Sequence, residues 1–183
     1  SSMQGNVSGN HNTAIGEGSL QTAFESHNNI AIGDDAMIYT IAGDDNTVMG
    51  QGAASMMLNG IGNVAIGKEA LRSDSMSTIV ETIAIGKKSL HSLSTGLRNT
   101  AIGTGALSKT DIGSDNIAVG YHTLENNVNG HTNIGIGGGA LNQNVLGVWN
   151  VAVGDSSLYD NNENFNTGLG HYTLQNGSGA QNT

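Results

Sequence analysis

The chain has 183 residues, with 28 Gly, no Pro and no Cys, and a formal net charge of -9. The absence of Cys excludes disulfides and thiolate metal sites, and the absence of Pro, with Gly at irregular spacing, excludes collagen. The negative charge argues against nucleic acid as a partner. Aromatic residues at 4% and charged residues at 11% do not suit an ordinary globular domain. No apolar run is long enough to span a membrane, so we expect no membrane insertion in this segment.

A repeat dominates the sequence. Residues 1–11 form an N-terminal lead-in, whose first three residues, Ser1 to Met3, resemble a remnant of an expression vector. The motif Asn-Thr-Ala-Ile-Gly and its variants then occur ten times within residues 12–181. The copies begin at Asn12, Asn29, Asn46, Asn63, Thr82, Asn99, Asn116, Asn133, Asn150 and Asn166. Asn182 and Thr183 begin a further, truncated repeat, so we expect the chain to be a fragment or a processed product.

Each unit reads Asn, β-branched, small, aliphatic, Gly, two variable residues, small and Leu, followed by about eight looser positions. We expect the motif Asn and Gly residues to have structural roles at the same place in every unit. The positions assigned to this role are Asn12, Gly16, Asn29, Gly33, Gly50, Gly67, Gly86, Asn99, Gly103, Asn116, Gly120, Gly137, Asn150, Gly154 and Gly170.

A period of about 17 residues is too short for a pair of helices. The alternating segment after each Asn predicts a short strand, which ends at the motif Gly, and the small-Leu pair predicts the start of a second strand. Two strands and two turns make one coil, so the fold class is all-β, a parallel β-solenoid or β-roll of about ten coils. We expect the Ile/Val column to point inwards and the Ala column to face the coil interior or a close neighbour. The unit that starts at Asn63 is longer than the others, and its two extra residues, between 72 and 81, are expected in a turn.

The Asn column has two interpretations. Stacked Asn side chains can form an amide ladder along the solenoid, or each Asn can cap only its own turn. Both are structural. A coil of this composition buries few aliphatic side chains of its own, so we also expect a second face to be buried against other chains, and therefore oligomerisation.

The repeat Asn99-Thr-Ala-Ile-Gly103-x-x-Ala106-Leu107 resembles the head repeats of trimeric autotransporter adhesins and the repeat regions of bacteriophage tail fibres and related bacterial surface fibres. The resemblance covers nearly the whole chain, from Asn12 to Thr183. It implies a left-handed β-roll in an intertwined or side-by-side homotrimer, located outside the cell, on a cell surface or a virion tail fibre. The adhesin heads usually have a shorter period, and this departure favours a phage-type fibre. The sequence also lacks the stalk heptads and membrane anchor of a complete autotransporter, and the self-cleaving chaperone in which phage-type fibres often end.

The sequence offers no convincing catalytic set, and we expect no enzyme activity, no cofactor and no metal. The six His residues lack a metal-ligand spacing, although a three-His site on a threefold axis is an alternative. The pairs Asp34-Asp35 and Asp44-Asp45 could attract Ca²⁺, but solvated turns are the simpler interpretation. The Thr residues are too irregular for an ice-binding ladder. A polysaccharide depolymerase would need paired carboxylates at a glycosidase separation, whereas Asp and Glu are scattered here.

Aromatic side chains in the second half of the chain are the candidate binding residues, because sugar rings stack on aromatic faces. Tyr121-His122 and His171-Tyr172 occupy the two variable positions after a motif Gly, and Trp149 precedes a motif Asn. The alternative is that these side chains only pack turns or chain interfaces. The predicted function is a structural and adhesive fibre segment, a trimeric β-roll that binds a glycan or protein on a host or target cell surface. The depolymerase and a purely structural spacer without a ligand remain the alternatives.

Overall fold

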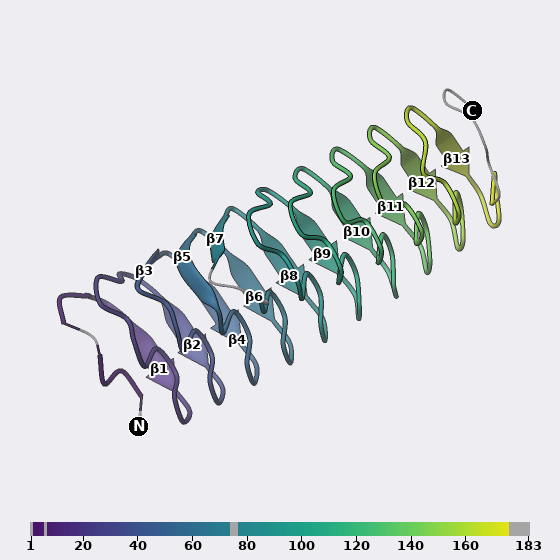
Figure 1. Cartoon of the computed structure of the whole chain (residues 1–183). Coiled ribbons are helices and arrows are strands. Elements are labelled where there is room, and N and C mark those ends of the chain that lie inside the picture. Colours follow the sequence, from purple (N-terminus) through teal and green to yellow (C-terminus); the bar gives the residue numbers. More distant parts are fainter. Residues whose placement is uncertain (1, 6, 74–76, 176–183) are drawn as a thin grey trace.

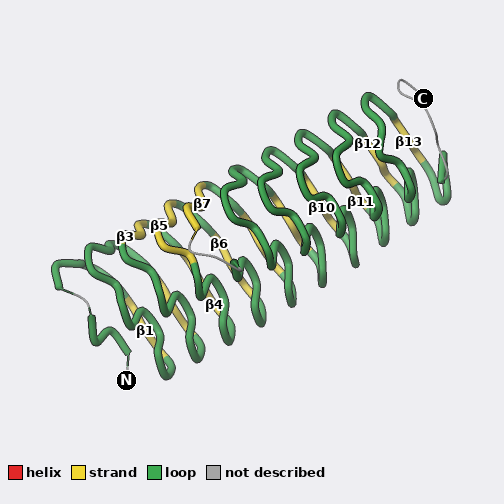
Figure 2. Tube along the Cα trace, viewed as in Figure 1, coloured by secondary structure: helices red, strands yellow, loops and turns green. Residues whose placement is uncertain are grey.

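The structure, a computed structural model, describes residues 2–5, 7–73 and 77–175. Within these ranges the chain forms 13 short β-strands and no helix, wound into one elongated rod (Figure 1). Turns and loops make up most of every coil (Figure 2). Ten strands form one parallel sheet: β1 (Thr13–Ile15), β2 (Ile30–Ile32), β4 (Thr47–Met49), β6 (Val64–Ile66), β8 (Ile83–Ile85), β9 (Thr100–Ile102), β10 (Ile117–Val119), β11 (Ile134–Ile136), β12 (Val151–Val153) and β13 (Thr167–Leu169). A second parallel sheet contains β3 (Ala42–Asp44), β5 (Met57–Ile61) and β7 (Ser77–Val80).

The register of the long sheet follows the repeat. Equivalent residues of successive coils pair directly, as Thr13 pairs with Ile30 and Ala31 with Val48. The predicted parallel β-solenoid is therefore confirmed. The longer unit keeps this register in the long sheet, where Val64 of β6 pairs with Ile83 of β8. In the short sheet Gly60 of β5 pairs with Ile79 of β7, but the register shifts between Met57 and Asn59. The extra residues lie in the connection before β7, inside the predicted stretch, although residues 74–76 are outside the described ranges.

The Ala column of the long sheet faces the coil interior, which is one of its two expected orientations, but the Ile/Val column does not face inwards. The central residue of each strand, usually Ala, points into the coil. Where this residue is Ala or Val, from β2 to β12, it is fully buried, whereas the Ile/Val residues on either side of it point outwards. The prediction that the Ile/Val column points inwards was wrong. The reason is space: a Cβ added to Gly135 in β11 would lie 2.7 Å from Cγ2 of Thr123 and 3.3 Å from Cδ1 of Leu124. The space is shared with the facing turn, because the branched Val48 is buried at the centre of β4, where Ala54 stands in the Leu column.

The predicted second strand at the small-Leu pair is also wrong, because these residues form a turn. The backbone of the Leu column is left-handed, with φ of 48° at Leu20, 51° at Leu124 and 51° at Leu158. Strand residues have negative φ, so this position ends any extended segment. The Leu side chains are nevertheless buried from Leu20 to Leu158, where they form the core opposite the Ala column.

The Asn ladder is confirmed. Oδ1 of Asn29 accepts hydrogen bonds from the backbone N–H and from Nδ2 of Asn46, at 3.0 and 2.9 Å. Nδ2 of Asn46 also donates to the carbonyl of Gly60 at 2.8 Å, which fastens the two ends of one coil. The same pattern recurs along Asn12, Asn29, Asn46 and Asn63 and along Asn99, Asn116, Asn133 and Asn150.

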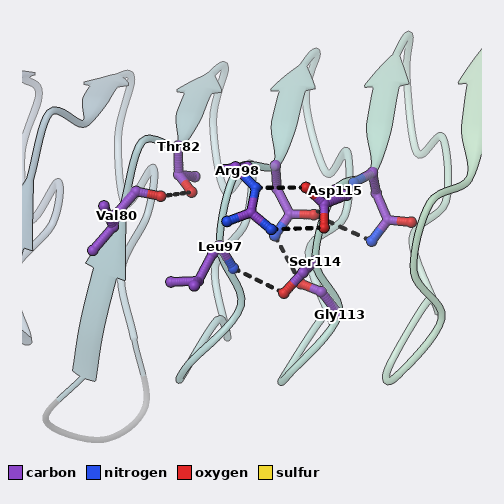
Figure 3. Close-up of polar contacts among 9 residues, drawn as sticks. Val80, Thr82, Leu97, Arg98, Gly113, Ser114 and Asp115 are labelled. Atoms are coloured by element: carbon purple, nitrogen blue, oxygen red, sulfur yellow. Dashed lines mark hydrogen bonds and ion pairs between the residues drawn. The ribbon is translucent and has the colours of Figure 1, made fainter.

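Thr82 interrupts the ladder between its two runs. Its backbone N–H still donates to Oδ1 of Asn63 at 2.9 Å, but its hydroxyl donates to the carbonyl of Val80 at 3.2 Å (Figure 3). Among the described residues, no side-chain hydrogen bond joins Thr82 to Asn99. One coil boundary is therefore held with fewer polar contacts than the others.

The N-terminal lead-in stacks on the first complete coil. The N–H groups of Met3 and Gly5 donate to the carbonyls of Ser19 and Gln21, at 3.0 and 2.7 Å. Met3 has a φ of 54°, similar to that of Leu20, and packs against the core. Met3 thus occupies the Leu column of an incomplete coil. The further repeat predicted at Asn182 and Thr183 lies outside the described residues.

Candidate functional site

The outward face of the ten-stranded sheet is the longest feature of the surface. It carries the first and third residues of each strand, of which 16 are Ile, Val, Leu or Met and four are Thr. We call these 20 side chains the aliphatic face. Nine of them are exposed large hydrophobic residues: Ile15, Ile30, Met49, Ile66, Ile83, Ile102, Ile117, Ile136 and Leu169. Ten strands about 4.8 Å apart and about 10 Å long give a patch of roughly 430 Å², which is the size of the largest apolar patch on a typical monomer, and such patches are often functional.

Two corners border the aliphatic face. The trailing corner holds the two residues after each motif Gly, and the leading corner holds the two residues before each motif Asn. Figure 1 shows the trailing corners as the loops that follow the strand arrowheads along one long edge of the rod. Because the strands are parallel and in register, residues from the same corner of successive coils are neighbours about 4.8 Å apart.

The predicted binding residues do not gather into one site. Tyr121 and His122 lie on the trailing corner after β10, with ring centroids 4.1 Å apart and planes at 77°. His171 and Tyr172 lie on the same corner after β13, with centroids 3.9 Å apart. The two pairs are three coils apart, about 14 Å at the usual strand spacing. They are separate surface features.

Trp149 lies on the leading corner, at the other end of the strands. Its ring stacks on Phe165 with centroids 4.9 Å apart and planes at 14°, and meets His131 edge-on at 5.7 Å. Trp149 and Phe165 are both 49% exposed. Phe165 and His131 were not among the predicted binding residues. The signal was present, because Phe165 precedes Asn166 just as Trp149 precedes Asn150.

A hollow of about 480 Å³ opens on the trailing side of three successive coils, over residues 87–92, 104–109 and 121–125. We call it the basic hollow, because Lys87, Lys88 and Lys109 line it. These are three of the six basic residues in the chain, whereas only one of its 15 acidic residues, Glu125, lines the same space. The hollow is thus a local concentration of positive charge on an acidic protein. These lysines were not predicted from the sequence, although aligning the units by column places them beside Tyr121.

Gly105 is one of the residues that line the basic hollow. It has a φ of 70°, and an added Cβ would lie 2.8 Å from both Cε1 and Nδ1 of His122 in the next coil. The imidazole of His122 therefore rests directly over the glycine. Its Nδ1 lies 2.8 Å from Oε2 of Glu125, but the two atoms do not have hydrogen-bond geometry.

The polar groups of the basic hollow are only partly paired. Nζ of Lys109 donates to Oδ1 of Asn126 at 2.8 Å and lies 3.7 Å from Oε1 of Glu125. Nζ of Lys88 lies 3.6 Å from Oε2 of Glu69, and the same oxygen is 3.6 Å from Nε2 of His91. That Nε2 is buried without a hydrogen-bond partner.

Lys87 is the least engaged of the three lysines. Within the part of the chain that the structure describes, its ammonium group has neither an ion pair nor a hydrogen bond. The hollow therefore offers a free positive charge.

A tighter ion pair lies on the leading corner. Arg98 donates from Nε to Oδ1 of Asp115 at 2.7 Å and from Nη2 to Oδ2 at 3.0 Å (Figure 3). This hydrogen bonding holds the pKa of Asp115 below its ordinary value and raises the pKa of Arg98. The side chains are 53% and 42% exposed, so the pair is a surface bridge of small energetic weight.

The other candidate chemistries find no support in the geometry. Asp34 and Asp35 follow β2, whereas Asp44 and Asp45 precede β4, so the two pairs lie at opposite ends of the strands. No group of three or more His, Cys, Asp or Glu side chains among the described residues could hold a metal ion. In the same part of the chain, no helix has the length and apolarity needed to cross a membrane.

Comparison of the chain with protein-family models, curated proteins and solved structures returned no match.

Proposed function

We propose that this chain is a segment of an extracellular fibre, in which three copies pack side by side through their aliphatic faces and display a surface-binding region. The observation that carries the proposal is the aliphatic face, because a row of Ile and Val side chains along ten strands is unfavourable in water. The resemblance of the repeat to trimeric adhesin heads and tail-fibre repeats supports three copies rather than two.

The energetics of a single coil support the same conclusion. At the strand centres the coil interior holds Ala or Gly opposite Leu, and Val48 only where Ala54 replaces Leu, so the larger Ile and Val side chains of the strands remain outside. Their apolar surface gains burial only against another molecule. At about 25 cal/mol per Å² of apolar surface, association through the whole face is strongly favourable before its entropic cost. A stiff rod with such a face suits a projecting fibre on a bacterial surface or a phage tail.

The mass in solution tests this assembly. Sedimentation equilibrium should give three times the chain mass of 18.7 kDa. The double variant Ile85→Asp, Ile102→Asp places two charges on the aliphatic face and should give monomers. The control Thr95→Asp, Asn129→Asp adds the same charges at exposed positions on another side and should remain trimeric. A monomeric wild-type chain, or a trimeric Ile85→Asp, Ile102→Asp variant, would contradict the proposal.

The adhesive role needs a separate test. A labelled wild-type trimer applied to an array of cell-surface glycans and to whole bacterial and animal cells should bind a subset of them, because three copies of a weak site add avidity. Trimers that bind neither glycans nor cells would leave the spacer role and reject adhesion.

A further inference from the structure

We propose that the basic hollow binds a carboxylated sugar, with the acid group at the lysines and the sugar ring beside Tyr121. The inference deepens the proposed surface-binding function and rests on it. It concerns the chemical class of the ligand: acidic saccharides rather than neutral ones.

The first argument is charge. The chain has a net charge of -9, so most of its surface repels anions, yet half of its basic residues line this one hollow. Lys87 has no partner among the described residues, and Lys88 and Lys109 face carboxylates only at 3.6 and 3.7 Å. A ligand carboxylate between these ammonium groups gains charge-assisted hydrogen bonds without removing a well-formed ion pair.

The second argument is the shape of the polar lining. Tyr121 is 66% exposed and its ring is supported edge-on by His122, so one face is available for an apolar sugar face. Ser92, Thr104 and Ser108 line the same space, and hydroxyl side chains of this kind suit sugar hydroxyls. An isolated inorganic anion would leave the tyrosine and these hydroxyls unused.

The third argument is size. A volume of about 480 Å³ falls in the range of small-ligand sites, roughly 300–1,000 Å³. Three coils span about 10 Å, which is the length of one or two sugar rings rather than of an extended nucleic acid. The hollow lies on the trailing corner and the turn that follows it and not on the aliphatic face, so side-by-side packing through that face leaves it open.

The experiment compares acidic sugars with their neutral counterparts. Isothermal titration of the wild-type chain would use trigalacturonic acid and its methyl ester, and 3′-sialyllactose and lactose, with sodium sulfate as a simple anion. At least one acidic sugar should bind tenfold or more tightly than both its neutral counterpart and sulfate, with affinity that falls as salt rises. Equal affinity for the neutral counterparts, equal affinity for sulfate, or no binding of either acid would overturn the proposal.

Matched variants locate the site. Lys87→Gln combined with Lys109→Gln removes two charges from the hollow and should weaken the acidic sugar at least tenfold. Lys68→Gln combined with Arg98→Gln removes the same total charge outside the hollow and should change the affinity less than twofold. Equal weakening by both double variants would show that only net charge matters, and would also overturn the proposal.

The mass in solution separates this inference from the assembly on which it rests. Each variant would be measured by sedimentation equilibrium in the same buffer as the titration. A trimer that binds no acidic sugar rejects the inference and leaves the fibre assembly intact. A monomer that binds the acidic sugar through Lys87 and Lys109 rejects the trimer and retains the inference.

Discussion

Replacing Asn116 by Ala tests the amide ladder at its most regular part. The side chain is fully buried, and its Nδ2 donates to Oδ1 of Asn99 and to the carbonyl of Gly130, at 3.1 and 2.9 Å. Its Oδ1 accepts from the backbone N–H and from Nδ2 of Asn133, at 3.0 and 3.3 Å. After the change Gly130 keeps a bond from Asn127, but the N–H of Asn133 loses its acceptor. One orphaned buried donor and the lost bonds together should cost about 3 kcal/mol.

Guanidinium unfolding followed by circular dichroism measures this cost. The control is Asn129→Ala, because Asn129 is exposed and makes no side-chain hydrogen bond within the described chain, so its unfolding free energy should change by less than about 0.5 kcal/mol. Both variants must be compared with wild type at one protein concentration and with the same mass in solution. An Asn116→Ala variant whose unfolding free energy equals that of the Asn129→Ala control would refute the ladder as a source of stability.

Three further outcomes are expected. Thr82→Asn should join the two ladder runs and raise the unfolding free energy by about 1 kcal/mol, measured in the same denaturation assay. NMR titration should give Asp115 a pKa below the ordinary value of an Asp carboxyl, and a pKa nearer to that value in the Arg98→Gln variant. Because the pKa is lowered in the folded state, the ion pair stabilises the fold slightly above about pH 4, and this stabilisation is lost at more acidic pH. Gly120→Ala should lower the melting temperature by several degrees or prevent folding, because Gly120 has a φ of 140° and the new Cβ would lie 2.6 Å from the carbonyl oxygen of Gly137. The control Gly138→Ala should be tolerated, since the nearest contact of its Cβ is the flexible side chain of Asp155.

The repeat made the parallel β-solenoid predictable, since ten copies at a nearly fixed spacing allow few other folds. The amide ladder was also predictable as one of two alternatives, because Asn is the side chain that can both donate to and accept from its own copy in the next coil. The place of the extra residues before β7 followed from the same alignment. These features depend on the column in which a residue stands, and columns can be read from the sequence alone.

The facing of the strands could not be read in this way, and the basic hollow was missed although Lys87 and Tyr121 share a column two coils apart. Alternation gives two faces but does not say which one is narrow, and the interior proved to have room only for Ala opposite Leu124 and its equivalents. Among the predicted binding residues, only the Tyr121-His122 pair lies beside a cluster of lysines. Those lysines come from the two preceding coils, so their proximity depends on stacking and not on any local motif.

The left-handed backbone of the Leu column has a consequence for the choice between two isomers. Leucine and isoleucine have the same atoms and nearly the same hydrophobicity, yet this column contains Leu in eight units, Met in one and Ala in one, with no β-branched residue. A side chain branched at Cβ is crowded by its own backbone at positive φ, where Thr132 is the one β-branched residue in the described chain, whereas a side chain branched at Cγ is crowded less. The choice of leucine over isoleucine in this column is therefore explained by the backbone conformation. The core of this rod is rich in leucine because leucine can both fill the space and tolerate the left-handed turn.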